Sequence, residues 1–221
     1  MSGDHLREYY DQRAREYEQI YERDDPVRQA ELAAIRTELR ARLAGRRVLE
    51  VACGTGYWTQ ACTDVARHVV AIDLAPEVLA VAREKSLPAE KVEFRIGDAD
   101  ALDAQAGEFD AGVAMFWLSH VPQSRLDAFL TQLHARLGQG ATVYMADNVY
   151  VPGVGGDLVT RPDSEDTYKR RRLASGRQYE IVKNYHTREQ LRELLQPRAA
   201  ELRIHFGECY WWSSYRVDEV A

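Results

Sequence analysis

The sequence predicts a doubly wound α/β fold, in which a mostly parallel sheet is covered by helices on both faces. Short apolar runs alternate with segments of helical periodicity over residues 26–148, the pattern of parallel strands joined by crossover helices. The first apolar run ends at two glycines, Gly54 and Gly56, and the second ends at an acid, Asp73. Sheets of this kind bind nucleotide-like ligands at the carboxyl ends of their strands.

Length and composition favour a single globular domain over residues 1–221. The chain is 45% hydrophobic and 29% charged, enough for a full core. Its net charge of −6 argues against nucleic acid as a partner. The sequence contains no membrane-spanning run and no secretory signal, and its three cysteines are not clustered. We therefore expect a cytoplasmic protein without membrane contact, as a monomer or a homodimer.

Residues 1–45 are expected to form an N-terminal helical cap. Residues 6–24 are rich in charge and tyrosine, with several rings at helical spacing. Two interpretations stay open, an amphipathic surface helix or a lid over a ligand. A second helix begins at Pro26 and continues to about Leu43, and Gly45 ends it.

Residues 46–148 form the expected core of the sheet. Its helices are predicted near Tyr57–Ala66, from Pro76 onward, and from Leu126 through Leu137, where glycines stop the last one. The strands between them are predicted at Arg47–Ala52, His68–Asp73, Val92–Ile96, Phe109–Phe116 and Thr142–Asp147.

The regular alternation ends after Asn148. We expect residues 149–186 to be an insertion that covers a substrate, with a strand at Gln178–Tyr185. The basic run Lys169–Arg172 fits either a solvated helix face or a site for an acidic group of the substrate. Residues 187–221 are expected to form a helix, begun by a capping box at Thr187. Strands at Glu201–Phe206 and Tyr210–Val217, or one long bent strand, are expected to follow.

The motif Glu50-x-Ala52-Cys53-Gly54-Thr55-Gly56, with Asp73 about 20 residues later, resembles the first motif, E-x-G-x-G-x-G, of class I S-adenosylmethionine-dependent methyltransferases. Ala52 replaces the first glycine of that pattern. The resemblance begins near Tyr9 and is specific only for the cofactor half. It implies a Rossmann-like, seven-stranded, mostly parallel sheet with an antiparallel last strand, a small-molecule substrate, and S-adenosylmethionine as cofactor with S-adenosylhomocysteine as product.

The resemblance also implies roles for single residues. Asp73 would accept hydrogen bonds from ribose hydroxyls, and Glu50 would orient the glycine turn or accept from the cofactor ammonium. Asp98 would face the adenine, although a local turn also explains it. The residues expected at the cofactor are Tyr9, Tyr17, Glu50, Ala52, Gly54, Gly56, Trp58, Asp73, Leu74, Asp98, Ala99, Phe116 and Trp117.

Methyl transfer is a direct displacement, so catalysis depends mainly on holding two reactants in line. No metal-ligand spacing is present, and no metal is expected. An oxygen or nitrogen acceptor must lose a proton, so His120 is the first candidate for a general base and His186 the second; His120 could equally cap a helix or pack beside the adenine. Substrate contacts are expected from Trp117, His120, Asn148 and Tyr168.

The leading hypothesis is methyl transfer to an O or N atom of a small metabolite, with an aromatic one as a candidate. The alternatives are an RNA- or protein-directed methyltransferase and a non-catalytic cofactor-binding sensor. A nicotinamide oxidoreductase is disfavoured, because Thr59 stands where its third glycine would be.

Overall fold

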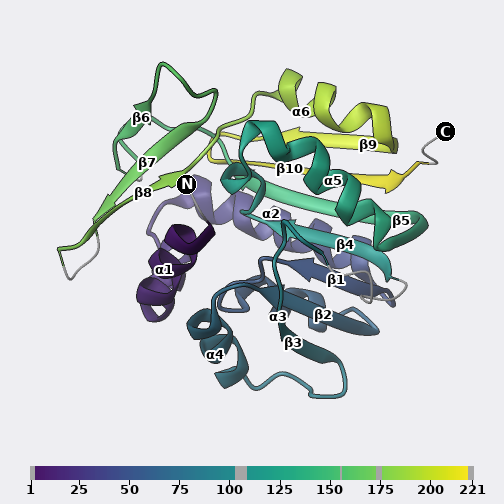
Figure 1. Ribbon diagram of the computed structural model, residues 1–221. Coiled ribbons are helices and arrows are strands. Elements are labelled where there is room, and N and C mark those ends of the chain that lie inside the picture. Colours follow the sequence, from purple (N-terminus) through teal and green to yellow (C-terminus); the bar gives the residue numbers. More distant parts are fainter. Residues whose placement is uncertain (1–2, 103–108, 155, 173–175, 219–221) are drawn as a thin grey trace.

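The computed structural model describes residues 3–102, 109–154, 156–172 and 176–218. Its main sheet has seven strands in the order β3-β2-β1-β4-β5-β10-β9 (Figure 1). Strands β1 to β5 run parallel, and β10 lies antiparallel between β5 and β9, which confirms the expected fold class. The strands are β1 (Arg47–Val51), β2 (His68–Asp73), β3 (Val92–Ile96), β4 (Phe109–Met115), β5 (Leu137–Asn148), β9 (Ala199–Phe206) and β10 (Tyr210–Val217).

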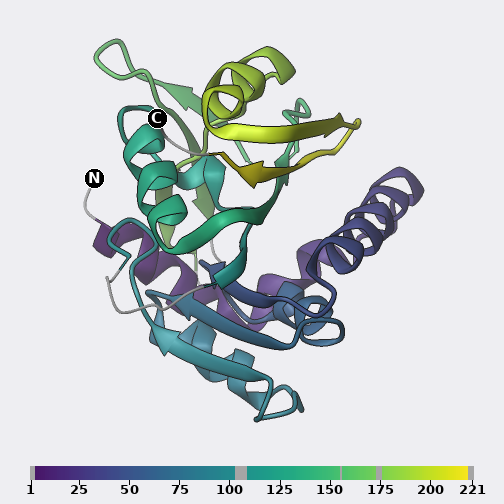
Figure 2. The same cartoon turned by 90° about the vertical axis from the view of Figure 1, so that its right-hand side faces the viewer.

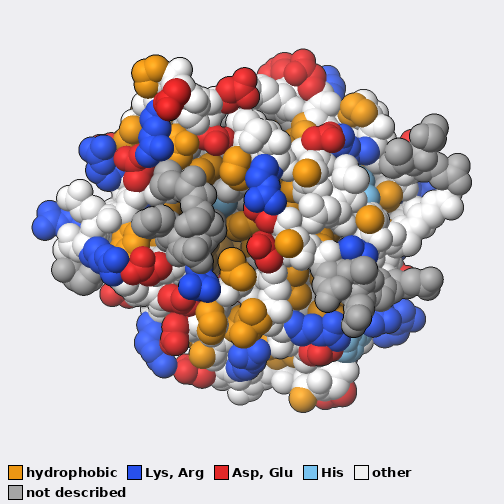
Figure 3. Space-filling model, in the orientation of Figure 1, with side chains coloured by type: hydrophobic (Ala, Val, Ile, Leu, Met, Phe, Trp, Pro, Cys, Tyr) orange, Lys and Arg blue, Asp and Glu red, His pale blue; other side chains and the backbone are white. Residues whose placement is uncertain are grey.

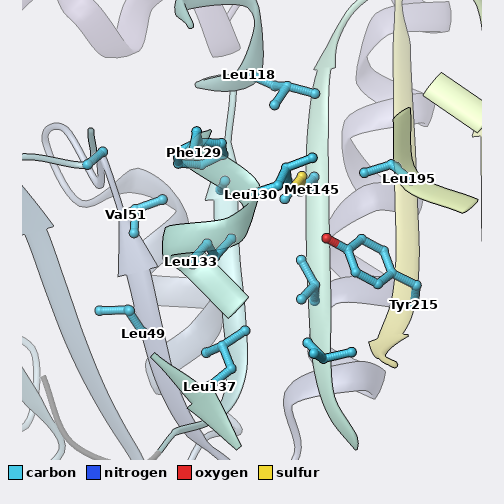
Figure 4. Packing of buried hydrophobic residues seen from close by; sticks show 14 of the residues in the cluster. Leu49, Val51, Leu118, Phe129, Leu130, Leu133, Leu137, Met145, Leu195 and Tyr215 are labelled. Atoms are coloured by element: carbon cyan, nitrogen blue, oxygen red, sulfur yellow. The ribbon is translucent and has the colours of Figure 1, made fainter. Parts of the chain in front are cut away.

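Helices cover both faces of the sheet, because side chains of its inner strands are apolar on both sides. In β1, Val48 joins the cluster of the first face, whereas Leu49 and Val51 pack toward Leu133 of the second (Figure 4). The first face carries α2 (Pro26–Leu43), α3 (Tyr57–Thr63) and α4 (Pro76–Glu84), and the second carries α5 (Leu126–Ala135) and α6 (Arg188–Leu195) (Figure 2).

The N-terminal cap is not one continuous α-helix. Helix α1 (Gly3–Arg13) continues as a 3-10 segment, η1 (Ala14–Tyr21). The rings of Tyr10, Tyr17 and Tyr21 contact one another edge to face. Helix α1 contacts α4 of the core on one side and the small sheet on the other (Figure 1), so the cap bridges two parts of the fold.

Residues after β5 form a second, antiparallel sheet of β6 (Leu158–Thr160), β7 (Thr167–Arg172) and β8 (Gln178–Val182). The basic run therefore lies in a strand, and its interpretation as a solvated helix face is wrong. Alternate side chains of a strand point to opposite faces. Lys169 is buried and its Nζ donates to the carbonyls of Val154 and Gly156, whereas Arg170 and Arg172 are exposed.

Most boundaries in the core differ from their predictions by at most three residues, and the largest difference is at Leu137. Leu137 lies in β5 and not at the end of a helix, since it pairs with Phe109 of β4. Sheet pairing prevails there because Leu137 also fills the space beside Gly112, where a Cβ would come within 2.8 Å of its side chain. The capping box of α6 is confirmed, with Thr187 Oγ1 accepting from the Gln190 amide at 3.2 Å.

Within the described ranges, three short 3-10 turns lie in the connections: η3 (Leu118–His120), η4 (Gln123–Arg125) and η5 (Gln196–Arg198). Among the described helices, none combines the length and the hydrophobicity that crossing a bilayer requires.

Candidate active site

The turn after β1 has an unusual backbone. Ala52, Gly54 and Gly56 all have positive φ angles, of 51°, 56° and 78°. A Cβ placed on Gly54 would meet no atom within 4 Å, whereas one on Gly56 would lie 3.1 Å from the Cβ of Ala82 in α4. Gly54 therefore borders open space, and Gly56 allows α4 to approach closely.

Asp73 ties the end of β2 to this turn. Its Oδ2 accepts from the Gly54 amide at 2.8 Å, and its Oδ1 accepts from the Ala75 amide at 2.9 Å. Burial raises the pKa of this carboxyl group. The side chain points to the mouth of the turn and lines the larger of two adjacent cavities.

This first cavity has a volume of about 220 Å³ and is bordered by residues that follow β1, β2, β3 and β4. In Figure 3, hydrophobic and acidic side chains surround a hollow near the centre of the visible face. The described lining contains two arginines, Arg7 and Arg125, and more acids than bases. The acids are Asp73, Asp98, Asp100 and Glu180.

Most residues predicted at a cofactor lie together around the first cavity. Asp98 lines it while its Oδ1 accepts from the Asp100 amide at 2.8 Å, so both interpretations of Asp98 fit the geometry. Trp117 lines it with a buried indole N–H that has no partner within the described part of the chain. The predicted residues on this lining are Tyr17, Ala52, Gly54, Asp73, Leu74, Asp98, Ala99, Phe116, Trp117 and His120.

Four other predicted residues lie outside that lining. Tyr9 borders the second cavity instead. Glu50, Gly56 and Trp58 are buried behind the turn. Burial raises the pKa of Glu50 to about 8, and neither carboxyl oxygen has a hydrogen-bond partner among the described residues.

The second cavity, of about 90 Å³, lies between the cap, the ends of β4 and β5, and the small sheet. It contains Asn148, which was predicted to contact substrate. Its wall is shared in part with the first cavity, so the two spaces adjoin. The shared residues are Tyr10, Tyr17, Phe116, His120 and Ile181.

His120 stands on the shared wall with a defined tautomer. Its Nδ1 lies 2.8 Å from the carbonyl oxygen of Val182, and its Nε2 lies 2.9 Å from the hydroxyl of Tyr10. A carbonyl oxygen can only accept, so Nδ1 carries the proton and Nε2 offers a lone pair to the Tyr10 hydroxyl. Burial, together with the positive charge of Lys183, lowers the pKa of His120 to about 3, which keeps the ring neutral at physiological pH.

A buried ion pair lies beside His120. Asp147, at the end of β5, is fully buried and lies 3.0 Å from Nζ of Lys183, which is 4% exposed. Burial would raise the pKa of Asp147, but the Lys183 ammonium outweighs it and lowers that pKa to about 2. Lys183 also donates to Ser119 Oγ at 2.5 Å, so the pair fastens the small sheet to the core.

Besides Glu50, Gly56 and Trp58, two more predicted residues, Tyr168 and His186, lie outside both cavity linings. The Tyr168 hydroxyl contacts Ser164 Oγ at 3.0 Å, and the Arg161 guanidinium lies 4.1 Å from its ring. His186 is buried, and burial lowers its pKa. Their predicted roles stay predictions.

Sequence reasoning did not bring together the cationic residues of the second cavity, which come from five separate segments: Arg13, Arg23, Arg28, Arg171 and Lys183. Arg13 and Arg23 lie in the charged segment 6–24, and Arg171 lies in the basic run that was a candidate site for an acidic group. Sequence reasoning also missed Asp147, for which an acid at the end of a buried strand is the available signal.

The sequence is similar to those of known methyltransferases. Residues 48–140 match the family model described as a methyltransferase domain. The ubiquinone biosynthesis O-methyltransferase of Xanthomonas campestris pv. campestris is 35% identical over 155 residues, which cover 66% of this chain and 62% of that relative. The chain thus spans about three fifths of the length of that curated relative.

Solved structures extend the likeness over nearly the whole chain. The complex of DhpI with SAH is 28% identical, with a TM-score of 0.79, and covers 97% of this chain and 96% of its own. The 1,6-didemethyltoxoflavin-N1-methyltransferase of Burkholderia thailandensis is 19% identical, with a TM-score of 0.65 and coverage of 98% and 89%, and shares the fold.

The first cavity fits the cofactor that the motif implies. Open space beside Gly54 admits a ligand against the backbone, and Asp73 lines that space. The excess of carboxylates suits a ligand with a sulfonium and an ammonium group. With this cavity, the sheet order and the likeness to DhpI with its bound SAH, the chain belongs to the class I S-adenosylmethionine-dependent methyltransferase family.

Proposed function

We propose that this protein transfers a methyl group to an O or N atom of a small molecule held in the second cavity. The observation that carries the proposal is the shared wall: two adjoining cavities of different character meet at His120, Tyr10 and Phe116. When bound in the first cavity, the cofactor supplies an electrophilic methyl group on a sulfonium sulfur. The protein's task is to hold the acceptor atom in line with that group.

Around the cofactor, we assign positions to residues of the first cavity. Asp73 accepts hydrogen bonds from the ribose hydroxyls, and Asp98 with Ala99 contacts the adenine. The unpartnered indole N–H of Trp117 is a free donor at the same lining. Gly54 leaves its side of the turn open. These assignments are the predicted roles placed on the observed cavity.

His120 is the residue that we assign to proton acceptance. Its Nδ1–H is fixed by the Val182 carbonyl, so Nε2 is the basic atom of the ring. The hydroxyl of Tyr10 occupies that atom at 2.9 Å. An acceptor O–H or N–H would take the place of the Tyr10 hydroxyl, and its proton would pass to Nε2 as the new bond to carbon forms.

The size of the second cavity favours a small acceptor. A volume of about 90 Å³ corresponds to about six to nine water-sized groups, since one water needs roughly 10–15 Å³ on this measure. Its rings, which include Tyr9, Tyr185 and Tyr210, suit an aromatic acceptor. The basic run gives little support to a polymer substrate, because Lys169 is committed to carbonyls inside the small sheet.

Calorimetry with S-adenosylhomocysteine, against NADH as the control ligand, tests the cofactor. We expect binding of the first and none of the second; preference for NADH would reject the proposal. Transfer from a labelled methyl donor into a metabolite extract, compared with total RNA, then tests the acceptor. Label in RNA alone would contradict a small-molecule substrate.

The same assay tests His120 once an acceptor is known. His120→Gln should lower methyl transfer about 100-fold, a typical general-base contribution, while leaving S-adenosylhomocysteine affinity nearly unchanged. His205→Gln removes an exposed imidazole and serves as the matched control. Equal activity of the two variants would remove His120 from the chemistry.

A further inference from the structure

We propose that the second cavity recognises an anionic substrate: a small molecule with a carboxylate or a tetrahedral oxyanion group held by Arg13 and Arg171. This inference rests on the proposed function, because it specifies the acceptor that the second cavity presents. The anionic group lies away from the shared wall, since neither arginine lines the first cavity. The methyl-accepting atom then lies near His120.

The charges around the second cavity are all of one sign. Its lining carries Arg13, Arg23, Arg28, Arg171 and Lys183, and no Asp or Glu occurs among the described residues that line it. This clustering runs against the chain's overall charge of −6. Like charges around a small space repel one another, so an anion between them would be bound favourably.

Three of these cations already have partners or lie in solvent. Lys183 is paired with Asp147. Arg28 lies 3.6 Å from the carboxylate of Asp25 and donates to a tyrosine hydroxyl. Arg23 is exposed, where water screens its charge. These residues contribute to the positive electrostatic potential of the cavity, but they are not available to form an ion pair with a ligand.

Arg13 and Arg171 are different. No carboxylate of the described chain lies within ion-pair distance of either guanidinium, and both side chains are half-buried. Arg13 donates to the Tyr9 hydroxyl at 2.7 Å and lies over aromatic rings. The Nε of Arg171 is buried and lacks any hydrogen-bond partner in the described residues. A guanidinium with unused donors matches two oxygens of a carboxylate or a tetrahedral oxyanion.

The anion would also act on the proposed base. The positive charges of Lys183 and Arg171, after burial, lower the pKa of His120. A negative group bound beside Arg171 would offset part of that field, so His120 would become more basic in the substrate complex. The charge of the substrate would thereby help to activate the residue that receives its proton.

Titration calorimetry with small probes tests the inference, with and without saturating S-adenosylhomocysteine. Butyrate and propylphosphonate are the anionic probes, butyramide is the neutral one, and propylammonium is the cationic one. We expect both anions to bind at least about tenfold more tightly than butyramide, since hydrogen bonds to charged groups are stronger than those to neutral ones. Propylammonium should not bind. The ratio of the two affinities for the anions distinguishes a planar carboxylate from a tetrahedral oxyanion on the substrate.

Variants locate the site. Arg171→Gln and Arg13→Gln should each weaken anion binding about tenfold, with S-adenosylhomocysteine affinity unchanged. Arg172→Gln removes the same charge from the exposed face of β7 and should have no effect. Thermal denaturation checks that each variant folds.

Equal binding of butyrate and butyramide, or equal effects of Arg171→Gln and Arg172→Gln, would overturn the inference. If the wild-type protein does not bind S-adenosylhomocysteine, the proposed function is rejected instead. The anion titrations without that ligand would still decide whether the second cavity binds anions.

Discussion

The two adjoining cavities differ in charge, in origin and in how they are built. The first is lined by four carboxylates and two arginines, and it lies at the ends of consecutive parallel strands. The second is lined by five cations from the cap, the small sheet and the loops between them. The positions of the strand ends in the sheet fix the shape of the first cavity. The second cavity exists only where separate segments of the chain meet.

This difference matches the two reactants that we propose. The family's cofactor carries positive charge on its sulfonium, and an anionic acceptor would carry negative charge. Cavity linings of opposite charge would hold each reactant on its own side of the shared wall. They would disfavour binding of either reactant in the other cavity. Each of the following predictions probes one side of that contrast.

The largest expected effect is on the free energy of unfolding and concerns the positively charged second cavity. Lys183→Met removes the partner of fully buried Asp147 and should lower the free energy of unfolding by about 3–5 kcal/mol, the cost of an uncompensated buried charge. Urea denaturation at neutral pH measures it. Adding Asp147→Asn should restore part of the loss. A loss below about 1 kcal/mol would mean that the pair does not fasten the small sheet to the core.

The next effect concerns Glu50, which is buried behind the turn that borders the acidic first cavity, and it depends on pH. The folded-state pKa of Glu50 is about 8, against 4.5 for the free side chain. The folded protein therefore binds more protons between these values, and its stability falls as pH rises through this window. Glu50→Gln removes that dependence, so the ligand-free variant should gain on the order of 2–4 kcal/mol over wild type at pH 9 and almost nothing near pH 4.

Urea denaturation across this pH range checks the prediction. A constant difference between Glu50→Gln and wild type would show that the buried carboxyl does not titrate there. The surface variant Glu189→Gln, at an exposed carboxylate, is the control and should not reproduce the trend.

The smallest of the three effects concerns the cofactor alone. Asp73→Asn should weaken S-adenosylhomocysteine binding about 10- to 100-fold, as expected for loss of a charge-assisted hydrogen bond. Binding of the small anions should not change, because Asp73 does not line the second cavity. Calorimetry measures both. Asp110→Asn, at the other end of the sheet, is the control, and equal affinities of the two variants would contradict the role of Asp73.

Much of the fold follows from local pattern. The strand predicted at Val92–Ile96 and the capping box at Thr187 were both confirmed, because apolar runs and capping signals act within a few residues. The error at Leu137 arose where a helical pattern and a strand pairing compete for the same residue. The error in the basic run arose because a charged strand in a small sheet lacks the apolar alternation that identifies strands.

By itself, the sequence determined the sheet and the strand-end part of the first cavity's lining, since motif residues such as Gly54 and Asp73 stand at the ends of adjacent strands. Only the tertiary structure decided the second cavity. Arg13 and Arg171 are 158 positions apart in the chain, and no local pattern relates them. They meet because the cap and the small sheet close over the same strand ends, through contacts such as Lys183 with Asp147.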